Sequence, residues 1–204
     1  FNATTPSTDG VRTWQFETRD IDEEWHPLYD TTIVDETPPV TTKRYGTPFY
    51  GNQNSEWIND NTTITLNPDD GNGINNSTTY YRVTMVYDGE EGDDYCQNVA
   101  CPNAEGSGQY LTYSNSFTIN EESCHLIEFR SIDQLGNEEE YKRQCAYVDL
   151  TPPDINKLVG QLQTGNCPPQ QNNISDKCFV NSETNITLEC EDGYINGRHP
   201  VGNE

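Results

Sequence analysis

The sequence predicts an all-β protein built from repeated antiparallel β-sandwiches, and three observations favour this fold class. Apolar and polar residues alternate in segments rich in β-branched and aromatic side chains, such as NTTITLNP (61–68) and TYYRVTMVYDG (79–89). No segment shows the apolar periodicity of a helix longer than about two turns. A phrase with two adjacent prolines occurs as VDETPPV (34–40) and again as VDLTPPD (148–154), which indicates a repeated unit.

The composition indicates small β-domains with polar surfaces. Only 31% of the 204 residues are hydrophobic, below the roughly 45–50% that is typical of globular chains on a count that includes glycine. The net charge of −23 would favour disorder, but aromatic residues make up 10% of the chain and argue against it. Nucleic acids and anionic membrane surfaces are excluded as partners because both require a basic surface. No apolar stretch approaches the roughly 18 residues of a membrane-spanning helix.

The middle of the chain supplies the strands of one sandwich. Ile64 and Leu66 share a face of the first clear strand, and Tyr81, Val83 and Met85 share a face of the second. With weaker strands around 40–50, the segments predict an antiparallel sandwich of about seven strands. The remaining clear strands are YLTYSNSFTI (110–119), CHLIEFRSID (124–133) and EEEYKRQCAYVDL (138–150), the last two joined by the turn QLGN (134–137).

Aligning the two proline phrases brings further segments into register. WINDNTTITLNPDDG (57–71) matches FVNSETNITLECEDG (179–193), and TWQFETRD (13–20) matches LIEFRSID (126–133). The period is too long for a solenoid of short units, so each repeat is expected to have its own core.

The alignment predicts three domains with boundaries near Pro38 and Pro152. These are the C-terminal part of one repeat (1–36), a complete repeat (37–150) and the N-terminal part of the next (151–204). The adjacent prolines restrict the residue before them and stiffen each boundary.

Five motifs in order carry a resemblance to a known family. The motifs TPPVTT, ITLNPDDGNGI, TYYRV, CHLIEFRSIDQLGNEEE and YVDLTPP resemble the Ig-like repeat of archaeal, bacterial or protist cell-surface proteins, in which VDxTPP seams join the domains. The match covers roughly residues 35–150. The resemblance implies tandem Ig-like domains that act as an extracellular structural module without enzymatic activity.

Seven cysteines without a zinc-binding pattern indicate disulfides and therefore an oxidising, extracellular compartment. We expect Cys124 to bond to Cys145 across the hairpin, Cys96 to Cys101, and Cys167 to Cys178, while Cys190 pairs beyond residue 204. The alternative, a nucleophilic thiol, lacks a histidine and asparagine pattern to activate it.

Six Asn-x-Ser/Thr sequons predict N-linked glycans on a secreted protein. On the strand after residue 61, Asn61 falls on the face opposite Ile64 and Leu66, and Asn185 falls on the outward face of the second copy. The alternative is that an Asn- and Thr-rich chain carries sequons by chance. The sequons begin at Asn2, Asn61, Asn75, Asn76, Asn173 and Asn185.

Acidic turns offer a candidate metal site. Asp69, Asp70 and Asn72 in NPDDGNG provide the hard oxygen ligands and tight turn that calcium requires, and ordinary solvated turns are the alternative. Neighbouring carboxylates in a turn do not make the facing pair of a glycosidase, so we expect no catalytic residues and no enzyme activity.

The sequence favours a structural role. The expected protein is a segment of a glycosylated extracellular filament, sheath or surface layer, with copies of itself as partners and no required cofactor besides N-linked glycans and, at the acidic turns, calcium. The alternative is an adhesin stalk or carbohydrate-binding module, for which Tyr45, Phe49, Tyr50 and Trp57 would form a sugar-stacking platform. Trp57 also has a simpler expected role as a core residue, since it aligns with Phe179.

Overall fold

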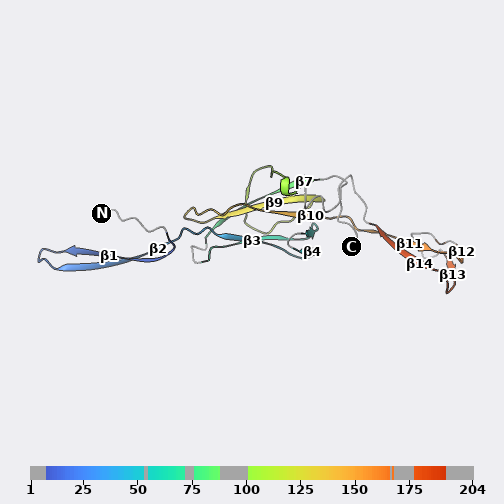
Figure 1. Ribbon diagram of the computed structural model, residues 1–204, viewed down its shortest axis with the longest axis horizontal. Coiled ribbons are helices and arrows are strands. Elements are labelled where there is room, and N and C mark those ends of the chain that lie inside the picture. The colour runs from blue at the N-terminus through green and yellow to red at the C-terminus, as the bar shows by residue number, and fades with distance from the viewer. Residues whose placement is uncertain are drawn as a thin grey trace.

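The computed structural model describes residues 8–52, 55–71, 76–87, 101–165, 167 and 177–191, and these residues form an almost entirely β protein (Figure 1). This confirms the predicted all-β class. The helical segment among them, α2 (Cys101–Asn103), has three residues. None of the described helices has the length and apolar character needed to cross a membrane.

The central part of the chain has two layers that enclose the main core. β3 (Val40–Tyr45) pairs with β6 (Ile64–Asp69) in one layer, and the other layer has the strand order β4-β5-β10-β9-β7-β8. The bounds in the second layer are Phe49–Asn52 for β4, Ser55–Ile58 for β5, Lys142–Val148 for β10, Ser123–Ile132 for β9, Thr78–Tyr87 for β7 and Leu111–Thr112 for β8.

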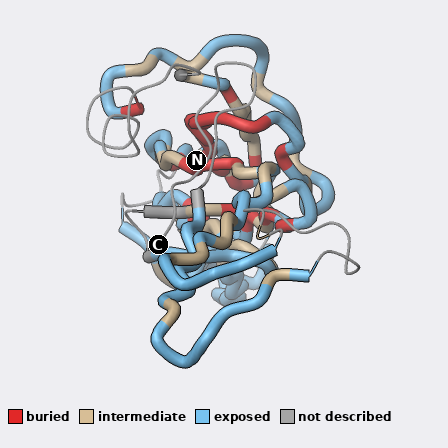
Figure 2. The backbone as a smooth tube through the Cα atoms, turned by 90° about the vertical axis from the view of Figure 1, so that its right-hand side faces the viewer, coloured by how far each residue is buried: buried red, intermediate tan, exposed pale blue. Residues whose placement is uncertain are grey.

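Alternation along the strands builds this core as the sequence predicts. Ile64 and Leu66 from β6 pack with Ile127 and Phe129 from β9, and all four side chains are at most 2% exposed. Ile58, Ile119, Ala146 and Val148 complete the cluster. The buried positions of the described chain all fall between Pro39 and Val148, and the flanking hairpins are mostly exposed (Figure 2).

Two details of the strand prediction are wrong. The sandwich is not purely antiparallel, because β5 runs parallel to β10, with Trp57 opposite Tyr147. The segment predicted as one strand over 110–119 divides between the layers: the Tyr113 N–H donates to Thr79 O of β7, whereas Phe117 bridges to Ile64 of β6. The polar run between these two contacts lets the chain cross from one sheet to the other.

The flanking strands repeat the central ones at fixed offsets. β1 (Gly10–Arg19) and β2 (Trp25–Val34) form a hairpin, and β9 begins and ends 113 residues after β1. β11 (Asp154–Val159) pairs with β14 (Ile186–Glu191) as β3 pairs with β6. The short pair β12 (Gln163–Gly165) and β13 (Cys178–Val180) occupies the place of β4 and β5. Figure 1 shows the central layers between these flanking strand pairs.

The disulfides correct two predicted pairings. Cys145 bonds to Cys101, so neither the Cys124–Cys145 nor the Cys96–Cys101 bridge forms, and Cys124 is itself in a disulfide. The reason is the hairpin register, which places Cys124 opposite Tyr147 and Cys145 opposite Leu126. The Cys167–Cys178 bond is confirmed. Cys190 is exposed and forms no disulfide in the described part of the chain.

The Cys101–Cys145 bond holds the segment that begins at Cys101 against β9 and β10, on the face turned away from the main core. We call this the outer face. A second apolar cluster forms there from Cys101, Cys124, Leu126 and Tyr147, each at most 2% exposed. β9 is therefore covered on both faces, although its sequence alternates as if one face were solvated.

Candidate functional site

The turn between β9 and β10 is built around Asp133. Its Oδ1 accepts hydrogen bonds from the backbone N–H groups of Leu135 and Asn137, both at 2.8 Å. Gly136 adopts a φ of 90°, a left-handed conformation that glycine enters without steric cost. The sequence D-x-x-G-N thus fixes a five-residue turn and, with it, the register of the hairpin.

The β1–β2 hairpin contains the same turn around Asp20. Its Oδ1 accepts from the N–H groups of Asp22 and Glu24 at 2.9 and 3.0 Å. These residues stand 113 positions before those of the β9–β10 turn. Asp20, Glu24 and the nearby His26 are exposed to solvent.

Glu139 connects the β9–β10 hairpin to β3. Its carboxylate is 7% exposed and accepts hydrogen bonds from the backbone N–H of Thr41 at 2.8 Å and of Ser131 at 3.2 Å. Lys142 forms an ion pair with Glu139 at 2.6 Å and donates to Thr41 O at 2.5 Å. Two side chains therefore satisfy the backbone of Thr41 as a neighbouring strand would.

The linker between β2 and β3 carries the first proline phrase. Asp35 Oδ1 accepts from Thr37 N–H at 3.2 Å, and the Thr37 hydroxyl donates to Asp9 Oδ2. Asn137 Nδ2 donates to Asp35 O at 3.0 Å, which joins the linker to the β9–β10 turn. We call this region the first seam; it includes the linker from Asp35 to Pro39.

The second proline phrase makes equivalent contacts. Asp149 Oδ1 accepts from Thr151 N–H at 3.0 Å, and the Thr151 hydroxyl donates to Glu122 Oε1 at 2.6 Å. We call the region of the second proline phrase the second seam. In each seam a threonine hydroxyl donates to the carboxylate of the residue just before a long strand, which is Asp9 before β1 and Glu122 before β9. The VDxTPP phrase has a defined local structure, and this structure occurs twice.

Three carboxylates from separate segments meet at the first seam. Asp35 lies in the linker, Asp70 directly follows β6, and Asp133 lies in the β9–β10 turn. One oxygen atom from each lies within 4.8 Å of those of the other two. Asp70 is 5% exposed and Asp133 is 7% exposed. We call these three residues the seam carboxylates.

The seam carboxylates differ in their hydrogen bonds. Both oxygens of Asp70 and Oδ2 of Asp35 are buried without a hydrogen-bond partner in the described structure. Burial raises the pKa of Asp70, and repulsion from neighbouring carboxylates, Asp35 first, adds to the increase. Burial also acts to raise the pKa of Asp133, but hydrogen bonds from Asn137 and the turn backbone outweigh it and hold that pKa below its ordinary value.

The predicted calcium ligands fit this arrangement only in part. Asp70 belongs to the seam carboxylates, whereas Asp69 Oδ1 accepts from Gly71 N–H at 3.0 Å, and Asn72 lies outside the described residues. Asp35 and Asp133 were missed because they are distant in sequence. The sequence did contain a pattern that could have pointed to these two residues. In the repeat alignment Asp35 matches Asp149, and Asp133 matches Asp20.

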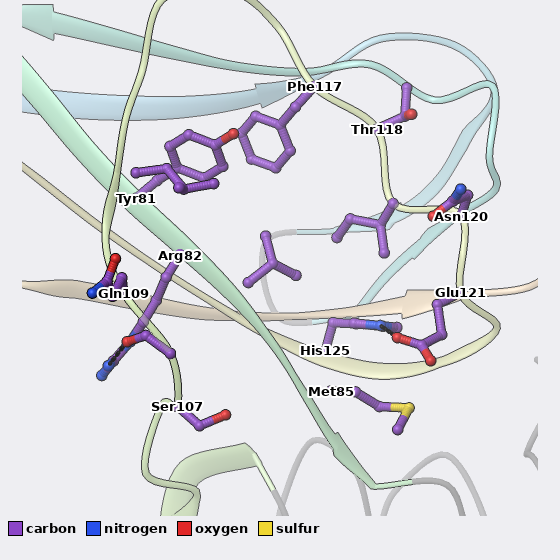
Figure 3. Close-up of a pocket in the computed structure, with 14 residues that line it drawn as sticks. Tyr81, Arg82, Met85, Ser107, Gln109, Phe117, Thr118, Asn120, Glu121 and His125 are labelled. Atoms are coloured by element: carbon purple, nitrogen blue, oxygen red, sulfur yellow. Dashed lines mark hydrogen bonds and ion pairs between the residues drawn. The ribbon is translucent and has the colours of Figure 1, made fainter.

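A cavity of about 640 Å³ lies beside β7 and is also lined by residues between 107 and 125 (Figure 3). His125 is 2% exposed, and its Nδ1 lies 3.0 Å from Ser123 O. Figure 3 shows Glu121 directed toward the ring of His125, whose Nε2 lies 3.8 Å from Glu121 Oε2. Ser107 also lines the cavity, and its backbone N–H donates to Thr84 Oγ1 at 3.0 Å.

The sequons in the described structure are accessible. Asn61, Asn76 and Asn185 are exposed, and Asn61 lies in the turn before β6 rather than on the strand itself. Asn2, Asn75, Asn173 and Cys96 lie outside the described residues. Glycan attachment at all six sequons stays a prediction.

The aromatic residues suggested as a platform divide into two groups. Tyr45 stacks on Phe49 with ring centroids 5.1 Å apart, and Tyr45 packs against the main core. Trp57 is partly buried against the outer-face cluster and stacks on Tyr147 at 6.1 Å, so it is not part of the main core. Tyr50, 59% exposed, is the most open of the four.

Comparisons with known proteins do not assign the chain to a family. No protein-family model, no curated protein and no solved structure matches the sequence or the fold.

Proposed function

We propose that the chain is a structural segment of an extracellular filament, sheath or surface layer, built from tandem Ig-like sandwiches and decorated with N-linked glycans. In this proposal the segment has copies of itself as partners and no catalytic role. The domains meet at the two VDxTPP seams, and residues 37–150 make up the complete unit.

The observation that best supports this proposal is that the same groups of hydrogen bonds occur twice along the described chain. Around β6, Thr62 N–H donates to Asn59 O at 3.0 Å; around β14, Thr184 N–H donates to Asn181 O at 3.2 Å. The two hairpin turns and the two seams recur in the same way. Independent domains joined by chance would not share turn chemistry, strand offsets and junction contacts, whereas copies of one unit would.

The layer order supports an Ig-like unit. β3 and β6 face a sheet in which β10, β9 and β7 are consecutive. In the same sheet the short strand β5 runs parallel to β10, the last strand of the unit. Extracellular placement is supported by the Cys101–Cys145 and Cys167–Cys178 bonds, since such bonds persist in oxidising compartments.

The proposal is tested on the native protein. Antibodies raised against the chain should label filaments, a sheath or a surface layer in electron micrographs of intact cells. Peptide mass spectrometry of that material should find glycans on Asn61 and Asn185 and oxidised Cys101 and Cys145. Recovery from the cytosol with bare asparagines and free thiols would contradict it.

A second candidate is a carbohydrate-binding or adhesin stalk function, favoured by the exposed rings of Phe49 and Tyr50. They line a shallow pocket of about 290 Å³ that also includes Trp57, Asn59 and Asp149. Aromatic faces beside amide and carboxylate groups are suited to sugar rings. A glycan-array signal that Tyr50→Ala abolishes would favour this candidate.

A further inference from the structure

We propose that Asp35, Asp70 and Asp133 bind one calcium ion at the first seam, between the β1–β2 hairpin and the central layers. The ligands come from the linker, the end of β6 and the β9–β10 turn, so tertiary structure brings them together. This ion site rests on the seam carboxylates themselves and does not depend on the proposed filament function.

The spacing of the oxygens suits calcium. Ca²⁺ binds oxygen at about 2.3–2.6 Å, so two ligand oxygens on one ion are separated by at most about 5 Å. The seam carboxylates meet this limit, with one oxygen from each within 4.8 Å of the others. Mg²⁺ binds at about 2.0–2.1 Å and keeps several of its waters, so it needs a tighter or wetter arrangement.

Burial without partners is the second, independent observation. Asp70 is 5% exposed, and neither of its oxygens accepts a hydrogen bond from a described residue. A buried carboxylate in this condition is costly because it has lost water without gaining a donor or a countercharge. Asp35 Oδ2 is in the same condition. Ordinary acidic turns, the alternative, would keep these oxygens in water.

Among the described residues, the seam carboxylates have no ion pair. Within the described chain, no lysine, arginine or histidine forms an ion pair with any of the three, and Lys142 pairs with Glu139 instead. Asp9 and Asp69 line the adjacent cavity of about 530 Å³ together with Asp35 and Asp70, which increases the negative potential. A divalent cation would supply the missing countercharge, and the cavity has room for the waters that complete its coordination.

Calcium at this position would fasten the linker to the central layers. Asp35 already connects to the β9–β10 turn through its carbonyl and Asn137. The ion adds a bond from the Asp35 side chain to Asp70 and Asp133, so bending at the seam becomes dependent on calcium.

The experiment uses the full chain with its disulfides intact, freed of metal with a chelator. CaCl₂ and, separately, MgCl₂ are titrated into it by isothermal calorimetry at constant ionic strength. The wild type should bind one Ca²⁺ with a Kd of about 10⁻³ M or tighter, in or below the range of extracellular calcium modules. Its Tm should rise with calcium concentration because the ion binds the folded state.

Asp70→Ala should weaken calcium binding at least about tenfold. Losing even a residue that only hydrogen-bonds to a metal ligand costs about 10–100-fold in metal affinity, and Asp70 would be a ligand itself. The matched control is Asp22→Ala, which removes an equal charge from an exposed turn and should bind as the wild type does. Asp35→Ser provides a second variant if circular dichroism shows that Asp70→Ala is not folded.

Three outcomes would overturn the proposal. One is the absence of saturable calcium binding up to about 10 mM, tenfold above the weak end of the extracellular range. Another is equal calcium affinity in the wild type and in a folded Asp70→Ala or Asp35→Ser variant. The third is an equal loss in Asp22→Ala and the seam variants, which would indicate diffuse attraction by the net charge.

Discussion

Replacing Glu139 with alanine should destabilise the central layers strongly. The substitution removes the acceptor of two buried backbone donors, the N–H groups of Thr41 and Ser131, whose residues are 1% and 0% exposed. Each buried donor left without a partner costs about 1–3 kcal/mol, so the free energy of unfolding should fall by about 2–6 kcal/mol. The loss of the Lys142 ion pair adds little, because that ammonium is partly solvated.

Urea unfolding followed by circular dichroism measures this cost. With a urea m-value of about 2 kcal/mol/M, the midpoint should move down by about 1–3 M. Glu140 is the matched control, because it is the same residue type at the next position and is exposed. Glu140→Ala should change stability by less than about 0.5 kcal/mol. Glu139→Gln retains one acceptor and should fall between them.

The reasoning would be refuted by equal midpoints for Glu139→Ala and Glu140→Ala. That result would mean that water or a rearranged side chain satisfies Thr41 and Ser131 at no cost. An unchanged midpoint for Glu139→Gln would indicate that hydrogen-bond geometry, and not the charge of Glu139, matters at this position.

Three further predictions concern the disulfide, the core and pH. Joint replacement of Cys101 and Cys145 by alanine should cost about 4 kcal/mol in urea unfolding, the loop entropy for a separation of 44 residues. Phe129→Ala should cost about 3–5 kcal/mol, whereas Phe16→Ala at the equivalent, 43% exposed position should cost much less in the same assay. Without calcium, Asp70→Ala should be more stable than the wild type at pH 7. This advantage should shrink as the pH falls through the raised pKa of Asp70, because the folded wild type then gains a proton before the unfolded chain does.

The strands that build the main core were predictable from the sequence because their inward-facing apolar residues alternate with polar ones, although β9 is buried on both faces. Ile64, Leu66, Ile127 and Phe129 lie on the inner faces that their positions require. The predicted Cys124–Cys145 bond is wrong because the hairpin register places Cys124 opposite Tyr147 and Cys145 opposite Leu126. The Asp133 turn sets this register through local side-chain hydrogen bonds, which the alternation of apolar and polar residues does not encode.

The seam carboxylates could not be found by local spacing. Asp69 and Asp70 are adjacent, but only Asp70 enters the cluster, since successive residues of an extended chain point to opposite sides. The other two members come from 35 residues before and 63 residues after Asp70 along the chain. Only the pairing of β3 with β6 and the packing of that layer on β9 bring them within reach of one another.

In the proposed array, the first seam would oppose bending without a large interface between neighbouring domains. The Thr37 hydroxyl donates to Asp9, just before β1, and Asn137 in the β9–β10 turn donates to the carbonyl of Asp35. Both contacts act on a linker whose prolines already restrict the backbone. A calcium ion on Asp35 would join the same linker to the end of β6, so three separate segments would oppose bending. If small-angle scattering of the full chain shows the same flexibility with calcium and with chelator, stiffness must instead come from the prolines and from the Thr37 and Asn137 contacts.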